Sequence, residues 1–432
     1  MIMRFAGIVL LLFCGALSAA ELTIEITSGN DNPTSIAVVP FGAPPGLLPP
    51  EAIDSIVSAD LQRSGLFAPL KVSDMIAQPH DQSEVFYNDW RLLGVDYLVV
   101  GRMTRDAAGL YRAQFELHDV LRQSRLSQET VNGSEAQLRD IAHYISDKVY
   151  EKLTGVRGAF STKVAYVSAA QLGPNRQSFR LIKADADGER AQTILESSEP
   201  ILSPAWSPDG KQLAYVSFED HRPGIYKQVI ASGQREKLTS FPGLNSAPAW
   251  SPDGRRMAMV LSKDDNPEIY MLDLVTRQFT RLTQHFAIDT EPSWMPDGRS
   301  LLFTSDRGGK PHIYQIDITT RELKRLTFEG AYNARPRAMP DGSGIIYVHR
   351  SQPGGPFHIA LQNLQRNTVK VLTETSYDES PSVAPNGSMI IYATKRLGKG
   401  ILGVVSVDAN VKYFLPSASR DVREPAWSPY IK

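Results

Sequence analysis

The chain has 432 residues, which is too long for one hydrophobic core and predicts two domains or a large repeat array. Its 46 lysine and arginine residues are balanced by 47 aspartate and glutamate residues. This balance gives no support for nucleic-acid binding or for a polybasic patch that binds membranes. A single cysteine, Cys14, excludes a disulfide framework and a cysteine-rich metal cluster.

The first 20 residues are typical of a cleavable export signal. Arg4 gives a positive start, residues 5–17 form a short apolar run, and residues 18–20 are small. We predict cleavage after Ala20, which exports the mature chain to the periplasm. Lipidation of Cys14 is the alternative, and its position inside the apolar run disfavours it.

Residues 21–34 are predicted to form a separate N-terminal segment. Leu22, Ile24 and Ile26 alternate with polar residues, which is typical of a strand, and turn-forming residues follow at 28–33. Two interpretations stay open. The segment is either an edge strand of the first domain or a detachable peptide that a partner binds by strand addition.

Residues 35–157 are predicted to form an α/β domain with helices packed on a mixed sheet. The expected elements are strands at 36–39, 69–72, 97–101 and 111–117, and helices at 53–65, 85–93 and 134–153. In the last helix, Ser134 and Gln137 match a capping box and Gly155 is the expected stop. Glycine-rich phosphate-binding motifs are absent from the sequence, which disfavours a nucleotide site.

Residues 158–432 contain a repeated stretch, Pro-Ala-Trp-Ser-Pro-Asp-Gly. Exact or degenerate copies, the last one truncated, return every 44 or 45 residues, beginning at Pro204, Pro248, Pro292, Pro336, Pro381 and Pro425. Three more short apolar strands follow each of the first five copies. Four strands in about 44 residues predict the blades of a β-propeller, in which the tryptophans pack between blades.

The two ends of the repeat array predict how the propeller closes. Residues 163–196 resemble the last three strands of a blade, but no copy of the repeated stretch precedes them. The copy at Pro425 has no strands after it. We therefore predict six four-stranded blades, the last of which combines strands from both ends of the array and leaves no exposed edge.

The loops before the repeated stretch differ from one another, and they are expected to gather at one mouth of the central channel. These loops are 197–203, 241–247, 285–291, 329–335, 374–380 and 418–424. Glu291 and Glu424 stand directly before the proline of their copies. They either bind a cation in the channel or face solvent there.

Catalytic signatures are missing from the chain. The sequence has no Gly-x-Ser-x-Gly nucleophile elbow, and its eight histidines show no His-x-x-x-His spacing. We therefore predict no enzyme activity, no cofactor and no metal. The alternative function is a periplasmic propeller hydrolase or lyase that uses carboxylates in the channel.

Several stretches together resemble one known family over the whole mature chain. They are residues 36–41, residues 58–65, residues 151–160, the repeat array and the terminal Pro-Ala-Trp-Ser-Pro-Tyr. The most specific of them is Leu-Thr-Gly-x-x-Gly-Ala-Phe at 153–160, since other propellers share the array. On these motifs the chain resembles the TolB family of the Tol-Pal system of Gram-negative envelopes.

The resemblance implies a monomeric, non-enzymatic periplasmic adaptor that is peripheral to the membrane and supports outer-membrane integrity and envelope constriction at cell division. It implies binding of the lipoprotein Pal at the propeller mouth, of TolA at the N-terminal segment, and of other outer-membrane proteins and colicins. The implied TolA-binding residues are Leu22, Ile24 and Ile26. The implied Pal-binding residues are Leu244, Asn245, Ala247, Asp289, Thr290, Glu291, Tyr377, Glu379 and Arg423. Leu244 departs from the histidine common in the family, which puts that contact in doubt.

Overall fold

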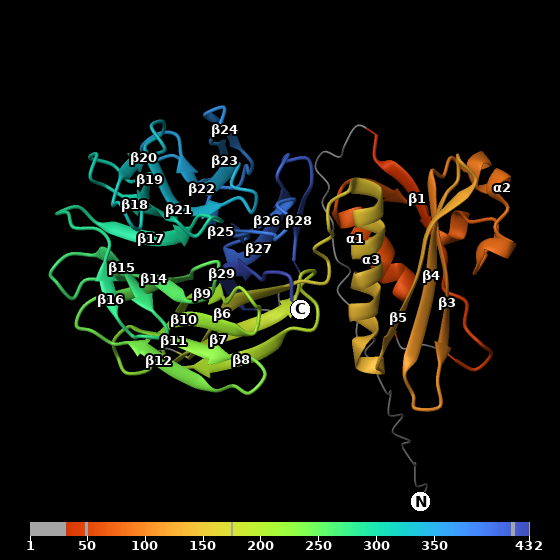
Figure 1. The fold of residues 1–432 in the computed structure, drawn as a ribbon, viewed down its shortest axis with the longest axis horizontal. Coiled ribbons are helices and arrows are strands. Elements are labelled where there is room, and N and C mark those ends of the chain that lie inside the picture. Colours follow the sequence, from red (N-terminus) through yellow and green to blue (C-terminus); the bar gives the residue numbers. More distant parts are fainter. Residues whose placement is uncertain (1–31, 48–50, 174–175, 416–419, 432) are drawn as a thin grey trace, which may run out of the picture.

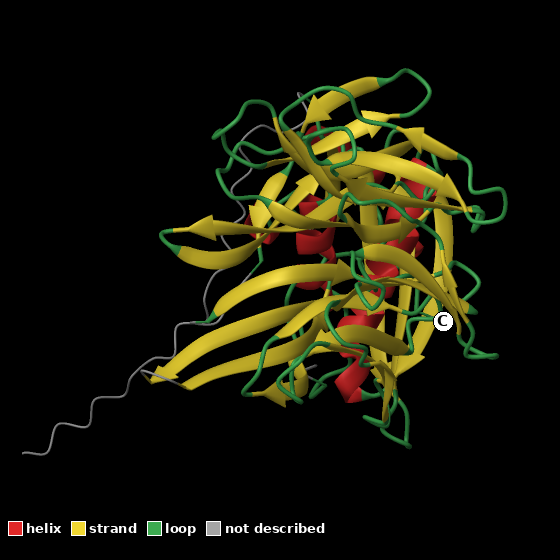
Figure 2. Ribbon diagram, turned by 90° about the vertical axis from the view of Figure 1, so that its left-hand side faces the viewer, coloured by secondary structure: helices red, strands yellow, loops and turns green. Residues whose placement is uncertain are grey.

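The computed structural model describes residues 32–47, 51–173, 176–415 and 420–431. They form an α/β domain beside a six-bladed β-propeller, as predicted (Figure 1). Viewed from the propeller, the helices group together behind the blades (Figure 2). The export signal, Leu22, Ile24 and Ile26 lie outside the described residues. Within the described ranges, no helix is both long and apolar enough to span a membrane.

The α/β domain is built on a five-stranded mixed sheet with the order β2-β1-β3-β4-β5. Strand β1 pairs in parallel with β2 and β3, whereas β3, β4 and β5 are antiparallel. The strands are β1 (Thr34–Val38), β2 (Phe67–Pro69), β3 (Tyr97–Arg105), β4 (Tyr111–Asp119) and β5 (Ser124–Gly133).

Two details of this sheet differ from the prediction. The second strand ends at Pro69, and Val72–Asp74 is a 3-10 turn, so the strand predicted at 69–72 was placed too late. Strand β5 was not predicted at all. It lies at the sheet edge and only Leu126 and Val131 pack on the core, so its apolar alternation is too weak to recognise.

Helices cover both faces of the sheet. The helices are α1 (Ile53–Arg63), α2 (Tyr87–Leu92) and α3 (Leu138–Thr154), and the short 3-10 turns are η1 (Val72–Asp74), η2 (Gln82–Glu84) and η3 (Glu135–Gln137). Helices α1 and α3 pack on one face, and Trp90 of α2 is buried against the other. The predicted capping box is confirmed, since Ser134 donates its backbone N–H to Gln137 Oε1 at 3.0 Å.

The propeller blades each contain four antiparallel strands, which we number by the order of their innermost strands. Blade 1 holds β9 (Ile201–Trp206), β10 (Gln212–Ser217), β11 (Gly224–Val229) and β12 (Arg235–Thr239). Blade 2 holds β13 (Asn245–Trp250), β14 (Arg256–Leu261), β15 (Glu268–Asp273) and β16 (Phe279–Arg281). Blade 3 holds β17 (Asp289–Trp294), β18 (Ser300–Ser305), β19 (His312–Asp317) and β20 (Leu323–Arg325).

The other three blades follow the same plan, and the last one confirms the predicted closure. Blade 4 holds β21 (Tyr332–Ala338), β22 (Gly344–Arg350), β23 (His358–Asn363) and β24 (Thr368–Val371). Blade 5 holds β25 (Glu379–Val383), β26 (Met389–Arg396), β27 (Lys399–Ser406) and β28 (Lys412–Phe414). Blade 6 holds the C-terminal β29 (Asp421–Trp427) together with β6 (Lys163–Gly173), β7 (Arg176–Asp185) and β8 (Gln192–Ser197).

The repeated tryptophans join neighbouring blades, as their periodicity predicted. Trp250 donates its indole N–H to Ala205 O of the preceding blade at 3.2 Å, and Trp294 does the same to Ala249 O at 3.0 Å. Trp206 of blade 1 likewise donates to Ala426 O of blade 6 at 2.9 Å, whereas Trp427 donates to Thr162 Oγ1, directly before β6 of its own blade, at 2.8 Å. Each ring thus buries apolar area while its one polar atom keeps a hydrogen bond.

The α/β domain is attached to the propeller by ion pairs at their interface. Arg139 of α3 lies 2.6 Å from Asp187 Oδ2, and Arg63 of α1 lies 3.6 Å from the same oxygen. Lys163 of β6 reaches back to Asp140 Oδ1 at 3.0 Å. Asp187 follows β7 in a turn on the propeller face opposite the loops that enter the innermost strands. The α/β domain therefore leaves those loops uncovered.

Candidate functional site

A ring of six residues surrounds the central channel, one from the innermost strand of each blade. We call it the channel ring, and it consists of Ser203, Ala247, Glu291, Arg335, Ser380 and Glu424. Their φ angles lie between 48° and 56°, a region that residues other than glycine rarely adopt. Each innermost strand has a pairing irregularity at this position.

This geometry corrects the sequence prediction in one respect. The sequence predicts that the residue before each proline belongs to a loop, but these residues lie inside the innermost strands at β-bulges. A bulge turns one side chain away from the regular alternation of a strand. The same strained backbone conformation recurs in every blade, so the ring is a regular structural feature of the channel.

Arg335 connects the acidic residues of the channel ring. Its Nε donates to Glu291 Oε1 at 2.8 Å, its Nη1 donates to Ser380 Oγ, and its Nη2 lies 4.0 Å from Glu424 Oε1. Burial acts to lower the pKa of Arg335, but Glu291, Glu424 and Glu379 together raise it. The two carboxylates therefore face a guanidinium in the channel, and a metal cation would have to compete with it.

Beside this ring, the mouth of the channel contains a cavity of about 500 Å³. Its walls come from blades 4, 5 and 6, with Glu291 added from blade 3. Four of the nine predicted Pal-binding residues line it: Glu291, Tyr377, Glu379 and Arg423. Tyr377 is 60% exposed, and Lys395 Nζ lies 5.0 Å from the centre of its ring.

The other five predicted residues lie on blades 2 and 3, outside this cavity. Leu244 is 38% exposed, whereas Asn245 is fully buried and donates its side-chain amide to Phe241 O at 2.7 Å. Asp289 is also fully buried, and Arg307 Nη2 donates to its Oδ2 at 2.6 Å. Thr290 is half-buried, and Ala247 belongs to the channel ring. The side chains of Asn245 and Asp289 therefore hold the mouth loops in place.

Sequence reasoning missed several exposed apolar side chains around the mouth. They are Phe286 at 88% exposure, Ile288 at 50%, Phe328 at 65% and Leu397 at 97%. The first three lie in or next to loops that enter innermost strands, and Leu397 is at the turn between β26 and β27. The sequence offered one signal for these residues, which is that apolar side chains occur in loops expected to be exposed. Exposed apolar groups commonly mark interaction surfaces.

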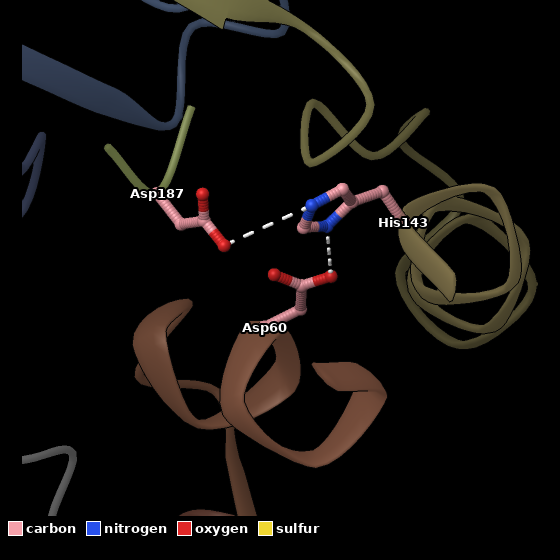
Figure 3. Close-up of side chains that lie close together, drawn as sticks. All are labelled: Asp60, His143 and Asp187. Carbon is pink, nitrogen blue, oxygen red and sulfur yellow. Dashed lines mark hydrogen bonds and ion pairs between the residues drawn. The ribbon is translucent and has the colours of Figure 1, made fainter. Parts of the chain in front are cut away.

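One cluster in the interface between the domains has the composition of a metal site. Asp60, His143 and Asp187 approach one another there (Figure 3). His143 Nδ1 lies 2.7 Å from Asp60 Oδ2, and its Nε2 lies 3.8 Å from Asp187 Oδ2. Burial alone would lower the pKa of His143, but Asp60, Asp185 and Asp187 raise it to about 9. Arg63 pairs with Asp60 and Arg139 pairs with Asp187, so cations of both helices already neutralise the carboxylates and the cluster forms an ionic contact between the domains.

Comparisons with known proteins agree with this architecture. A family model described as the TolB beta propeller domain matches residues 150–431, and one described as the TolB amino-terminal domain matches residues 22–126. The Tol-Pal system protein TolB of Pseudomonas fluorescens (strain SBW25) is 54% identical over 430 residues, covering 100% of this chain and 99% of the relative. That of Pseudomonas putida is 56% identical over 433 residues, covering 100% of both.

A solved structure shows the same arrangement of domains. The crystal structure of TolB from Acinetobacter baumannii is 43% identical in sequence and superposes with a TM-score of 0.87, covering 95% of this chain and 100% of that one. Identity at this level across both domains, together with the match of both family models, establishes the family of the chain. The chain belongs to the TolB family of Tol-Pal system proteins.

Proposed function

We propose that this protein is a non-enzymatic periplasmic adaptor that binds the lipoprotein Pal at the propeller mouth and TolA through its N-terminal segment. In this role it links the outer membrane to the inner-membrane Tol proteins and supports envelope integrity and constriction at division. The main support is the mouth itself, where exposed apolar residues surround a cavity with charged walls.

The chemistry of the mouth suits a protein partner. Phe286, Phe328 and Tyr377 expose large rings, and such rings contribute much of the binding energy at interfaces. Glu379 and Arg423 line the cavity that lies between blades 4, 5 and 6. Charged groups at the rim of an apolar surface fix the orientation of a partner more than they add affinity.

The predicted enzyme alternative finds less support in the mouth. A hydrolase or lyase that used channel carboxylates would require Glu291 or Glu424 to act as a base. The guanidinium of Arg335 contacts Glu291 and approaches Glu424, and Ser203 donates its backbone N–H to Glu424. Carboxylates engaged in this way stabilise the channel ring.

A variant of Tyr377 tests the proposed Pal interface. Tyr377→Ala removes an exposed ring, so the fold is expected to persist with an unchanged melting temperature. Affinity for purified Pal, measured by calorimetry, is expected to fall by about 10-fold, which is typical for the loss of an aromatic anchor. The matched control is Val275→Ala, which removes an exposed apolar group at the turn between β15 and β16 on the opposite face. Equal affinity of Tyr377→Ala and the wild-type protein would remove this part of the mouth from the interface.

A truncated chain tests the proposed TolA contact. A protein that begins at Pro33 lacks Leu22, Ile24 and Ile26 and is expected to lose TolA binding in a pull-down while its melting temperature is unchanged. The full mature chain with Thr27→Ala is the control, because that substitution keeps the three alternating apolar residues. Retained TolA binding by the truncated chain would contradict strand addition by this segment.

A further inference from the structure

A second cavity lies in the channel on the far side of the channel ring from the mouth. Its volume is about 330 Å³, and it extends to Pro208, Pro252 and Pro429 at the opposite face of the propeller. Indole and pyrrolidine rings form much of its wall. The channel ring, which includes the predicted Pal-binding residues Ala247 and Glu291, forms its end toward the mouth. The cavity is large enough to hold a small molecule.

Six equivalent residues line this cavity, each two positions after a member of the channel ring. We call them the inner layer, and they are Ala205, Ala249, Ser293, Arg337, Ser382 and Ala426. Five of them have small side chains, whereas Arg337 places a long cation in the channel. Burying a charge costs free energy unless it is paired, so this departure from the repeat calls for a partner.

The charge of Arg337 is not matched by an ion pair with another described residue. Its Nη1 donates to the neighbouring carbonyl, Pro336 O, at 2.8 Å. Arg335, which belongs to the channel ring, takes the contact with Glu291 instead. The pKa of Arg337 is lowered, mainly by burial and also by Arg335, although the carboxylates of Glu291 and Glu424 act to raise it. An anion that entered the cavity would therefore meet a guanidinium with unused donors.

The inner layer is divided into a polar half and an apolar half. Ser293 and Ser382 belong to the blades on either side of Arg337, so three polar residues lie next to one another. The Ser382 hydroxyl accepts the Trp427 backbone N–H at 2.8 Å and keeps its own proton available to donate. The remaining three residues are alanines, and tryptophan rings lie beside them.

From this division we propose that the cavity binds a small organic carboxylate with an apolar body. The carboxylate would pair with Arg337 between the hydroxyls of Ser293 and Ser382. The apolar body would lie against the alanines and tryptophans of the opposite half. A guanidinium suits this ligand because its planar donors match the two oxygens of a carboxylate.

The test uses the full mature protein and four probes: hexanoate, acetate, inorganic phosphate and hexylamine. Hexanoate is expected to bind about 10-fold more tightly than acetate in calorimetry, because only hexanoate has an apolar body. Phosphate is expected to bind more weakly than hexanoate, and hexylamine is expected not to bind. Tighter binding of phosphate, or equal binding of hexylamine, would overturn the proposal.

Two variants locate the site. Arg337→Ala introduces the residue that blades 1, 2 and 6 carry at the same position, so the fold is expected to tolerate it. This variant is expected to bind hexanoate at least about 10-fold more weakly, as the loss of a charge-assisted pair predicts. Arg255→Ala removes an exposed arginine from a turn on the same face and is expected to bind as the wild-type protein does. Equal affinity in the Arg337→Ala variant would overturn the proposal.

A measurement on the wild-type protein needs no variant. Four of the five tryptophans, Trp206, Trp250, Trp294 and Trp427, line this cavity, and Trp90 lies in the α/β domain. Hexanoate is expected to shift indole N–H signals of the first four in NMR spectra and to leave Trp90 unchanged. Shifts confined to Trp90, or no shifts at saturating hexanoate, would contradict a site in the channel.

Discussion

A chain that ends at Glu424 is expected to melt at least about 10 °C below the full-length protein, or to fail to fold. The truncation removes the second half of β29, the innermost strand of blade 6. Blade 6 would then expose the edge of β6, and the propeller would lose its closure. Thermal unfolding followed by circular dichroism measures the effect.

The size of this effect follows from what the last residues bury. Trp427 is 9% exposed, and loss of a buried tryptophan side chain typically costs about 3–5 kcal/mol. Thr162 and Lys163, at the start of β6, also lose hydrogen-bond partners. Thr162 Oγ1 accepts the Trp427 indole N–H, and Lys163 donates its backbone N–H to Ser428 Oγ at 2.9 Å. A total on the order of 5 kcal/mol corresponds to about 10–20 °C in a domain of this size.

A shorter truncation provides the matched control. A chain that ends at Tyr430 keeps β29, Ser428 and the packing of Tyr430 on Arg157, whose guanidinium carbon lies 3.9 Å from the ring centre. Its melting temperature is expected to stay within about 2 °C of the full-length value. If the chain ending at Glu424 melts with the full-length protein, β29 is not what closes the propeller.

The repeats explain why so much of the fold was predictable from the sequence. Each Pro-Asp-Gly turn is specified locally, since Gly210 adopts a φ of 70° and Asp209 Oδ1 accepts the Lys211 backbone N–H at 3.0 Å. Strand β5 had no such local signal. Its position is set by pairing with β4 across the sheet, and an exposed edge strand needs few apolar residues.

The site was harder to predict because contacts distant in sequence decide which polar residues are exposed. Asp289 looked available, but Arg307, 18 residues later, holds it inside blade 3. The positions of the channel-ring residues could not be predicted for a different reason. A residue before proline normally favours extended backbone, so the left-handed φ of Glu291 and Arg335 could not be expected from sequence. The sequence shows that Arg337 replaces the alanine or serine of the other copies. Only the structure shows that this arginine lines a cavity in the channel.

The interface between the domains is expected to respond to pH through His143. Its imidazole lies between α1 and the turn after β7 (Figure 3). The side chain is almost fully buried. The pKa of His143 is about 9 in the folded protein, above the ordinary value of 6.5. The stabilisation from its charge is therefore complete below pH 6.5 and is lost as the pH rises toward 9.

Four other groups of this interface do not titrate between pH 6.5 and pH 9. Asp60 of α1 and Asp185 of β7 have lowered pKa values, because cationic neighbours offset the effect of burial, and they stay ionised. Burial raises the pKa of Tyr413, a neighbour of Arg63 in the same interface, to about 12, so its hydroxyl stays protonated. The cationic side chain of Arg63 keeps its charge throughout, since its pKa is raised further.

The free energy of unfolding of the wild-type protein is expected to fall by about 3 kcal/mol between pH 6.5 and pH 9, from the raised pKa of a buried group. His143→Gln removes the titrating proton, so this decline should largely disappear, and its stability at pH 6.5 should already be lower by a similar amount. Urea denaturation at a series of pH values measures both effects. His221, which is exposed, provides the control: His221→Gln should keep the wild-type decline. A decline that persists unchanged in His143→Gln would show that another group couples the two domains to pH.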